Sequence, residues 1–240
     1  MIDSWVYTIP GWLTPHEGHF LYASAVSVRD VDGVVVEIGS FQGKSTVFLA
    51  RASPSVVSVD PHEGNVSGGI LSPTYNAFIS HLTRAGVRKN VRAIVSTSKQ
   101  AARRWKKPIS YLFIDGLHDI KHAREDYEFW SPFVVDGGIV AMHDAFCGWD
   151  GSGIVAMTHI VHGSSYTEIG VVGSIIYGVK GKPQTFQRII KVFRRAIIDL
   201  CQKIHKNEHL PKWVRFILVH KLLRIFLLNR FSTLRQNNFF

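Results

Sequence analysis

The stretch that decides the fold is VVVEIGSFQGKSTVFLA, residues 34–50, in which a β-branched run passes into a helical pattern through a turn with two glycines. A phosphate loop of the Walker type needs four residues between its first glycine and its Gly-Lys pair. Three residues separate Gly39 from Gly43. The dinucleotide-binding fingerprint fails as well, because Phe41 stands where its second glycine would admit a pyrophosphate. The stretch therefore predicts a buried strand, a tight turn and a helix that hold some other ligand.

The same alternation of strand and helix continues along the chain to about residue 180. It predicts a parallel sheet with crossover helices. The predicted strands are 34–38, 56–59, 91–95, 110–114 and 139–142, and the predicted helices are 45–51, 74–85, 98–105 and 120–134. Residues 167–172 and 175–180 flank Gly173-Ser174, a pattern typical of a two-residue hairpin turn. We therefore expect an α/β fold with a doubly wound, Rossmann-like sheet, mostly parallel and closed by an antiparallel hairpin.

The composition predicts a globular body with a basic tail. The chain has 240 residues, of which 46% are apolar, so it can bury a sizeable core. Two cysteines are too few for a disulfide framework, and no signal-peptide pattern opens the sequence, so we expect a cytoplasmic protein. Residues 1–185 hold 16 Lys and Arg against 16 Asp and Glu, whereas residues 186–240 hold 12 against 2. The net charge of +10 thus lies in residues 186–240, which we predict to be a helical appendage.

The appendage has the pattern of basic amphipathic helices. Apolar residues from Phe186 to Ile204 recur at helical spacing, with basic residues opposite. A second apolar segment, 213–231, is interrupted too often by Arg and Lys to span a bilayer. The pattern fits peripheral binding to an anionic membrane surface, and it fits a second arrangement equally well. The alternative is a helical pair docked on the body or on the partner of a homo-oligomer. Nucleic acid is disfavoured as a partner, because the aromatic residues lie in the apolar faces rather than free to stack on bases.

The body's motifs resemble those of a known family. Glu37-x-Gly39-x-x-x-Gly43, Asp60 at the end of the second strand and the closing hairpin are similar to the class I S-adenosylmethionine-dependent methyltransferases. YLFIDGLHDIKHAREDYEFWSPFVVDGGIVAMHDAF (111–146) and IPGWLTPHEGHFLY near the start resemble the subgroup of macrolide-sugar O-methyltransferases and cephalosporin-hydroxylase-like proteins. The likeness covers roughly residues 9–180 and implies a seven-stranded sheet with S-adenosylmethionine as cofactor.

The resemblance implies a cofactor site around the glycine turn. Glycine lets the backbone turn tightly and approach a ligand. Glu37 is implied to lie near the ammonium of the methionine moiety, the alternative being a cap of the following helix. Asp60 can accept both ribose hydroxyls, and its alternative role is also a cap. Ser96 is expected on the adenine side, where an ordinary turn is the alternative. The full expected set is Glu37, Gly39, Ser40, Gly43, Ser45, Asp60, Ser96 and Asp115.

A second site is expected where the fourth and fifth strands end. Carboxyl ends of adjacent parallel strands face one crevice, so Asp115 and Asp144 should lie close together and repel unless a proton or cation separates them. The resemblance implies Asp115, His143 and Asp144 as metal-position residues for Mg²⁺. Because imidazole is a poor ligand for Mg²⁺, the alternatives are that His143 lies behind the metal ligands or that the site takes a softer metal such as Mn²⁺. The other interpretation is a pair of hydrogen-bonded strand ends. His118, after Asp115-Gly116-Leu117, is the candidate general base, the alternative being a surface hydrogen-bonding residue.

These expectations together predict a metal-assisted O-methyltransferase that acts on a hydroxyl of a sugar or a small polyhydroxylated natural product. The expected partner is a small-molecule or glycan acceptor. Two alternatives remain from the residues alone. One is a nucleic-acid methyltransferase or binder recruited by the basic tail, and the other is a non-catalytic module associated with a membrane.

Overall fold

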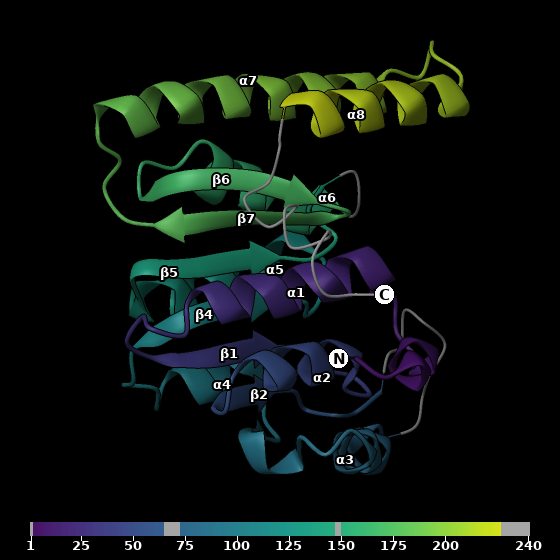
Figure 1. The fold of residues 1–240 in the computed structure, drawn as a ribbon, viewed down its shortest axis with the longest axis vertical. Coiled ribbons are helices and arrows are strands. Elements are labelled where there is room, and N and C mark those ends of the chain that lie inside the picture. Colours follow the sequence, from purple (N-terminus) through teal and green to yellow (C-terminus); the bar gives the residue numbers. More distant parts are fainter. Residues whose placement is uncertain (1, 65–72, 147–149, 227–240) are drawn as a thin grey trace.

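The computed structural model describes residues 2–64, 73–146 and 150–226 (Figure 1). Its centre is a seven-stranded sheet in the order β3-β2-β1-β4-β5-β7-β6. The strands are β1 (Val34–Ile38), β2 (Val56–Val59), β3 (Val91–Ile94), β4 (Ile109–Ile114), β5 (Val134–Met142), β6 (Tyr166–Val172) and β7 (Ile175–Lys180). Strand β7 is antiparallel to both β5 and β6, whereas the pairings among β1 to β5 are parallel. The predicted fold class is confirmed.

Helices cover both faces of the sheet, which is why its strands are apolar on both sides. One face packs against α1 (Pro15–Ser27), α2 (Lys44–Ala52) and α3 (Tyr75–Arg84). The other packs against α4 (Ser98–Ala102), α5 (Ile120–Trp130) and α6 (Asp150–Ala156). Within β1, Val35 belongs to the core under α1 and α2, and Val36 to the core under α5. The alternation of side chains along each strand thus divides the interior into two cores.

Several predicted boundaries are wrong, each for a local reason. The helix predicted for 120–134 ends at Trp130, since Pro132 cannot continue it, and Val134 already begins β5. The helix predicted for 98–105 ends at Ala102. Helix α1 was not predicted, although Thr14-Pro15-His16-Glu17 contains a capping box and a proline at the first helical position. This helix supplies a residue to the site described below.

The tail forms two helices, α7 (Thr185–Lys206) and α8 (Lys212–Phe226), which lie side by side beyond β6 (Figure 1). The part of the second predicted segment after residue 226 lies outside the described residues. Ile198 and Cys201 of α7 are fully buried in the same core as Tyr166 and Ile169 of β6. Within the described part of the chain, every helix is too short or too polar to cross a membrane.

Candidate active site

The glycine turn between β1 and α2 is held in shape by Asp60. One oxygen of the Asp60 carboxylate accepts hydrogen bonds from the backbone amides of Ser40 and Phe41, at 2.7 and 2.8 Å, and the other accepts from the amide of His62 at 2.6 Å. Gly39 has a φ of 82°, and a Cβ there would collide with the carbonyl oxygen of Asp115. The turn therefore packs directly against the end of β4.

Glu37 lies beneath this turn and is fully buried. Its two carboxylate oxygens accept hydrogen bonds from the hydroxyls of Ser45 (2.6 Å) and Thr46 (2.5 Å), in the first turn of α2. Burial raises the pKa of Glu37 to about 7, although these hydroxyls partly oppose the rise. In this geometry Glu37 stabilises the start of α2, as in the capping interpretation. Ser45 takes part in this stabilisation through the hydrogen bond from its hydroxyl. Contact with a cofactor ammonium stays a prediction.

The other predicted cofactor residues lie along the same edge of the sheet. Gly43 is the N-cap of α2, with a φ of 90° that favours glycine. Ser40 is buried. Ser96 follows β3, and its amide donates to the carbonyl oxygen of Asp60 at 3.3 Å. On the outer side, Trp12 and Phe41 lie with ring centroids 5.6 Å apart, so the N-terminal segment lies against the glycine turn. The sequence analysis assigned no role to Trp12, and no local pattern marks it.

The ends of β4 and β5 meet as predicted. Asp115, His118 and Asp144 each offer a ligand atom, and these atoms lie within 4.8 Å of one another. His118 Nε2 lies 3.5 Å from Asp144 Oδ2, and His118 Nδ1 lies 3.4 Å from the hydroxyl of Ser152. All three members of the cluster are partly exposed, so a ligand can reach them. We call Asp115, His118 and Asp144 the acidic cluster.

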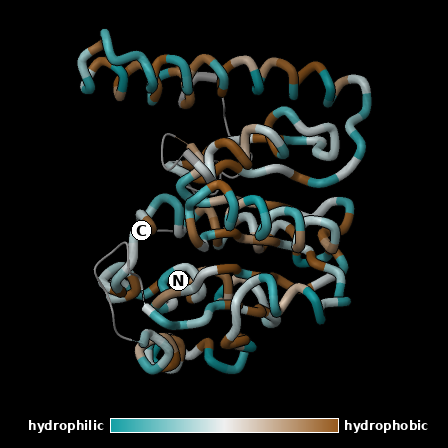
Figure 2. The backbone as a smooth tube through the Cα atoms, turned by 180° about the vertical axis from the view of Figure 1, so that it is seen from behind, coloured by the Kyte–Doolittle hydropathy of each residue, from teal (hydrophilic) through white to brown (hydrophobic). Residues whose placement is uncertain are grey.

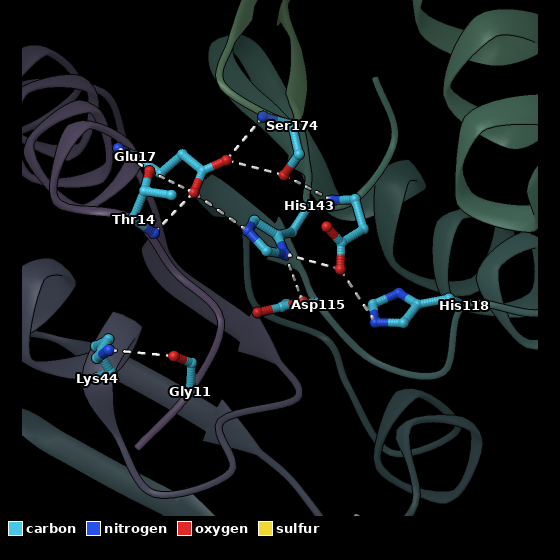
Figure 3. Close-up of polar contacts among 9 residues, drawn as sticks. Gly11, Thr14, Glu17, Lys44, Asp115, His118, His143 and Ser174 are labelled. Carbon is cyan, nitrogen blue, oxygen red and sulfur yellow. Dashed lines mark hydrogen bonds and ion pairs between the residues drawn. The ribbon is translucent and has the colours of Figure 1, made fainter. Parts of the chain in front are cut away.

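His143 lies behind the acidic cluster rather than in it (Figure 3). Only 3% of its side chain is exposed, and Nδ1 lies 3.1 Å from Asp115 Oδ1 and 3.4 Å from Asp144 Oδ2. Nε2 lies 3.6 Å from Glu17 Oε2. Neither ring nitrogen is aligned for a hydrogen bond, and the three contacts are ion pairs when the imidazole is protonated. Burial lowers the pKa of His143, but the surrounding carboxylates outweigh burial and hold the pKa well above 6.5.

Glu17, from α1, was missed by the sequence analysis. Its carboxylate accepts hydrogen bonds from the amide and hydroxyl of Thr14 (2.8 and 2.7 Å) and from the amide and hydroxyl of Ser174 (2.7 and 2.8 Å) (Figure 3). Burial raises the pKa of Glu17, but the neighbouring His143 and these four donors outweigh burial and lower the pKa to about 2. Glu17 is therefore ionised at neutral pH.

Ser174, in the turn between β6 and β7, connects Glu17 to Asp144. Its hydroxyl accepts a hydrogen bond from the Asp144 amide at 3.2 Å, and its carbonyl oxygen accepts from the amides of Ala145 and Phe146. Asp144 has a φ of 50°, in the left-handed region that non-glycine residues rarely adopt. These hydrogen bonds hold the strained backbone and so fix the direction of the Asp144 carboxylate.

Comparison with known proteins identifies a domain and a shared fold. Residues 36–145 match the family model described as a methyltransferase domain. Among solved structures, the O-methyltransferase NovP is 14% identical, with a TM-score of 0.61, covering 70% of this chain and 80% of that one. The O-methyltransferase TomG of Streptomyces achromogenes, in complex with S-adenosylmethionine, is 17% identical, with a TM-score of 0.55 over 74% of this chain and 87% of that one. CalS11, a TDP-rhamnose 3'-O-methyltransferase, is 17% identical, with a TM-score of 0.51 over 74% and 86%.

The fold, the glycine turn and the matched region agree: residues 36–145 are a methyltransferase domain, and the sheet around it has the fold of the solved O-methyltransferases named above. At these identities the solved structures share its fold, and those named here are O-methyltransferases. The matched domain extends from β1 through the acidic cluster to Ala145, so it contains both the glycine turn and the cluster.

Proposed function

We propose that this chain transfers a methyl group from S-adenosylmethionine to a hydroxyl of a sugar or of a small polyhydroxylated natural product. The observation that carries the proposal is the position of the acidic cluster beside the glycine turn. Asp115 joins the two, since its amide donates to the carbonyl oxygen of Ile38 at 2.8 Å and its own carbonyl oxygen contacts Gly39. Ligands of such sheets bind at the carboxyl ends of the strands, so cofactor and acceptor would meet here.

A hydroxyl is a weak nucleophile until its proton is removed. In the proposed reaction the acceptor oxygen forms a bond to the methyl carbon while the bond from that carbon to the sulfonium sulfur breaks. His118 takes the proton of the hydroxyl. Its imidazole is 27% exposed and faces Asp144 across 3.5 Å, which suits a base that receives a proton from a bound acceptor. Asp144 would stabilise the imidazolium that results.

The acidic cluster also fits a divalent cation. It provides two carboxylates and one imidazole, partly exposed and with ligand atoms within 4.8 Å, a set that suits Mg²⁺ or Mn²⁺ with open positions for other ligands. A bound cation would polarise the acceptor hydroxyl. Asp115 and Asp144 are the proposed ligands. His143, which the resemblance placed at the metal position, is instead proposed to orient the two carboxylates from behind. The raised pKa of His143 favours its charged form, which would relieve part of the repulsion between the two carboxylates.

The same geometry permits a second role for His118, as a third metal ligand, because its ring nitrogen belongs to the group within 4.8 Å. The two roles are separable. If His118 is the base, His118→Ala should lower the turnover rate about 10²–10⁴-fold with metal affinity preserved. If it is a ligand, the same variant should lose metal affinity, as measured by calorimetry with Mn²⁺.

The proposal is tested by methyl transfer from labelled S-adenosylmethionine to TDP-rhamnose and related sugars, with and without a chelator. Asp144→Asn is the informative variant, because asparagine tolerates a positive φ while lacking the charge. It should abolish transfer and leave cofactor affinity largely intact. Asp136→Asn, at an exposed position of β5, is the matched control. Full turnover in the chelated enzyme would reject the metal, and full turnover of Asp144→Asn would reject the cluster as the acceptor site.

Two other functions make different predictions. A nucleic-acid methyltransferase would transfer the methyl group to RNA or DNA and bind it with a steep salt dependence. A non-catalytic module would bind S-adenosylmethionine weakly or not at all. The named O-methyltransferase neighbours favour the small-molecule acceptor over both alternatives.

A further inference from the structure

We propose that exposed apolar side chains of α7 and α8 bind the surface of an anionic membrane. We call this set of side chains the tail face. Its residues are between 38% and 72% exposed. They are Phe186, Ile189, Ile190 and Phe193 of α7, with Trp213, Phe216 and Ile217 of α8.

Helix α7 is attached to the body by other residues. Lys191 Nζ donates to the carbonyl oxygens of Gly163 and Tyr166, at 2.5 and 2.9 Å, and Arg194 pairs with Glu168 at 2.8 Å. Ile198, one turn further, is fully buried. The members of the tail face on α7 recur at i, i+3, i+4 and i+7, so they share one side of the helix. One side of α7 therefore contacts the body, and a different side carries apolar residues that are exposed. Figure 2 shows hydrophobic and hydrophilic residues alternating along α7.

The charge of the tail indicates what this apolar side binds. Residues 186–240 hold 12 Lys and Arg against 2 Asp and Glu, whereas the rest of the chain is balanced. Lys203, Lys206, Lys212 and Lys221 are exposed in the described helices. Apolar and aromatic side chains beside cations are the composition of a helix that lies in the headgroup region of an anionic bilayer. Each such cation contributes about 1 kcal/mol of attraction near the surface.

A second copy of this chain fits the tail face less well. A twofold contact would bring the same patch of both chains together. Two tails of the same strong charge would then repel each other across the interface. A membrane rich in anionic lipid has the complementary sign.

Nucleic acid also carries a charge complementary to the tail. The sequence-based argument against it, that the aromatic residues of the tail are not free to stack on bases, is wrong. Phe186, Trp213 and Phe216 are 72%, 68% and 65% exposed rather than buried in the apolar faces of the helices. Their neighbours decide in favour of lipid. Ile189 and Ile217, at 64% and 43% exposure, add aliphatic surface beside the aromatic residues of their own helices, and aliphatic side chains offer no stacking platform to bases.

The test is sedimentation of the full chain with vesicles of phosphatidylglycerol and phosphatidylcholine in equal parts, compared with vesicles of phosphatidylcholine alone. Deletion of the tail would also remove Ile198 and Cys201, which are buried, and would expose the core of the body that they cover. Point variants in the full chain are therefore used. Phe186→Gln with Ile189→Gln, and separately Lys203→Glu with Lys212→Glu, should each weaken binding to the anionic vesicles about tenfold or more. Binding of the unaltered chain should fall as salt rises.

Each pair has a matched control on the body. Phe129→Gln with Ile120→Gln makes the same chemical change at exposed positions of α5, and Lys106→Glu with Lys107→Glu makes the same charge change before β4. Both controls should bind vesicles like the unaltered chain. The proposal is overturned if the unaltered chain ignores anionic vesicles, or if the controls lose as much binding. It is also overturned if sedimentation shows a dimer that only the variant Phe186→Gln with Ile189→Gln dissociates. Binding of an RNA oligonucleotide without binding of the vesicles would overturn it as well.

Discussion

Replacing Glu17 by glutamine tests the buried network behind the acidic cluster. Glutamine keeps the size of the side chain, so no cavity forms, but it removes the charge beside His143 and turns one acceptor into a donor facing Thr14 or Ser174. The pKa of Glu17 lies at about 2 instead of its ordinary 4.5. Since one pH unit is worth about 1.36 kcal/mol, this lowering corresponds to about 3 kcal/mol of folding stability at neutral pH.

The pH dependence distinguishes this charge effect from simple packing. A carboxyl whose pKa is lowered by folding stabilises the protein above its unfolded pKa, and the stabilisation is lost as the pH falls toward the folded pKa. The difference between the two proteins should therefore be full above about pH 5 and shrink between pH 4.5 and about 2. Urea unfolding followed by tryptophan fluorescence measures it, with Glu128→Gln as an exposed control. A loss below about 1 kcal/mol at pH 7, or one that is independent of pH, would refute the reasoning.

Three further changes test the site. Asp60→Ala should weaken S-adenosylmethionine binding by about 1–3 kcal/mol in calorimetry, because the amides of the glycine turn lose their acceptor, as would the ribose hydroxyls if they bind Asp60 as predicted; unchanged affinity, or tighter binding of ATP or NAD, would contradict the assignment. Ser174→Ala should lower the turnover rate more than the cofactor affinity, because the Asp144 amide loses its acceptor; equal losses in both would point to general unfolding. Gly39→Ala should lose both cofactor binding and stability, since its Cβ would collide with the Asp115 carbonyl oxygen, and a normal melting temperature would count against that packing.

Local sequence patterns predicted most of the fold because parallel strands buried on both faces are β-branched runs. Val34–Ile38 and Val56–Val59 were predicted with their observed bounds. The meeting of Asp115 and Asp144 followed from topology, since Asp115 stands directly after β4 and Asp144 is the second residue after the neighbouring parallel strand β5. These features depend on short-range patterns and on one general rule of sheet geometry.

The network behind the site could not be read in the same way. Thr14 and Glu17 form a capping box, which indicates a helix start and nothing about a second contact with Ser174, 157 residues away. The direction of His143 depends on what packs above the end of β5, and that neighbour is the unpredicted α1. The exposure of Phe186 could not be predicted from the sequence either, because helical periodicity identifies an apolar side of a helix without showing whether another element covers it.

The long reach of Glu17 has a consequence for the order in which the protein is made. During synthesis α1 leaves the ribosome early, whereas the turn that carries Ser174 follows only after the five strands of the parallel part. A nascent chain that ends near residue 145 already contains the glycine turn and both aspartates, but Glu17 still lacks the amide and hydroxyl that Ser174 supplies. Closing so long a loop is slow. The support that Glu17 and Ser174 give to the end of β5 can therefore form only after the closing hairpin has been made.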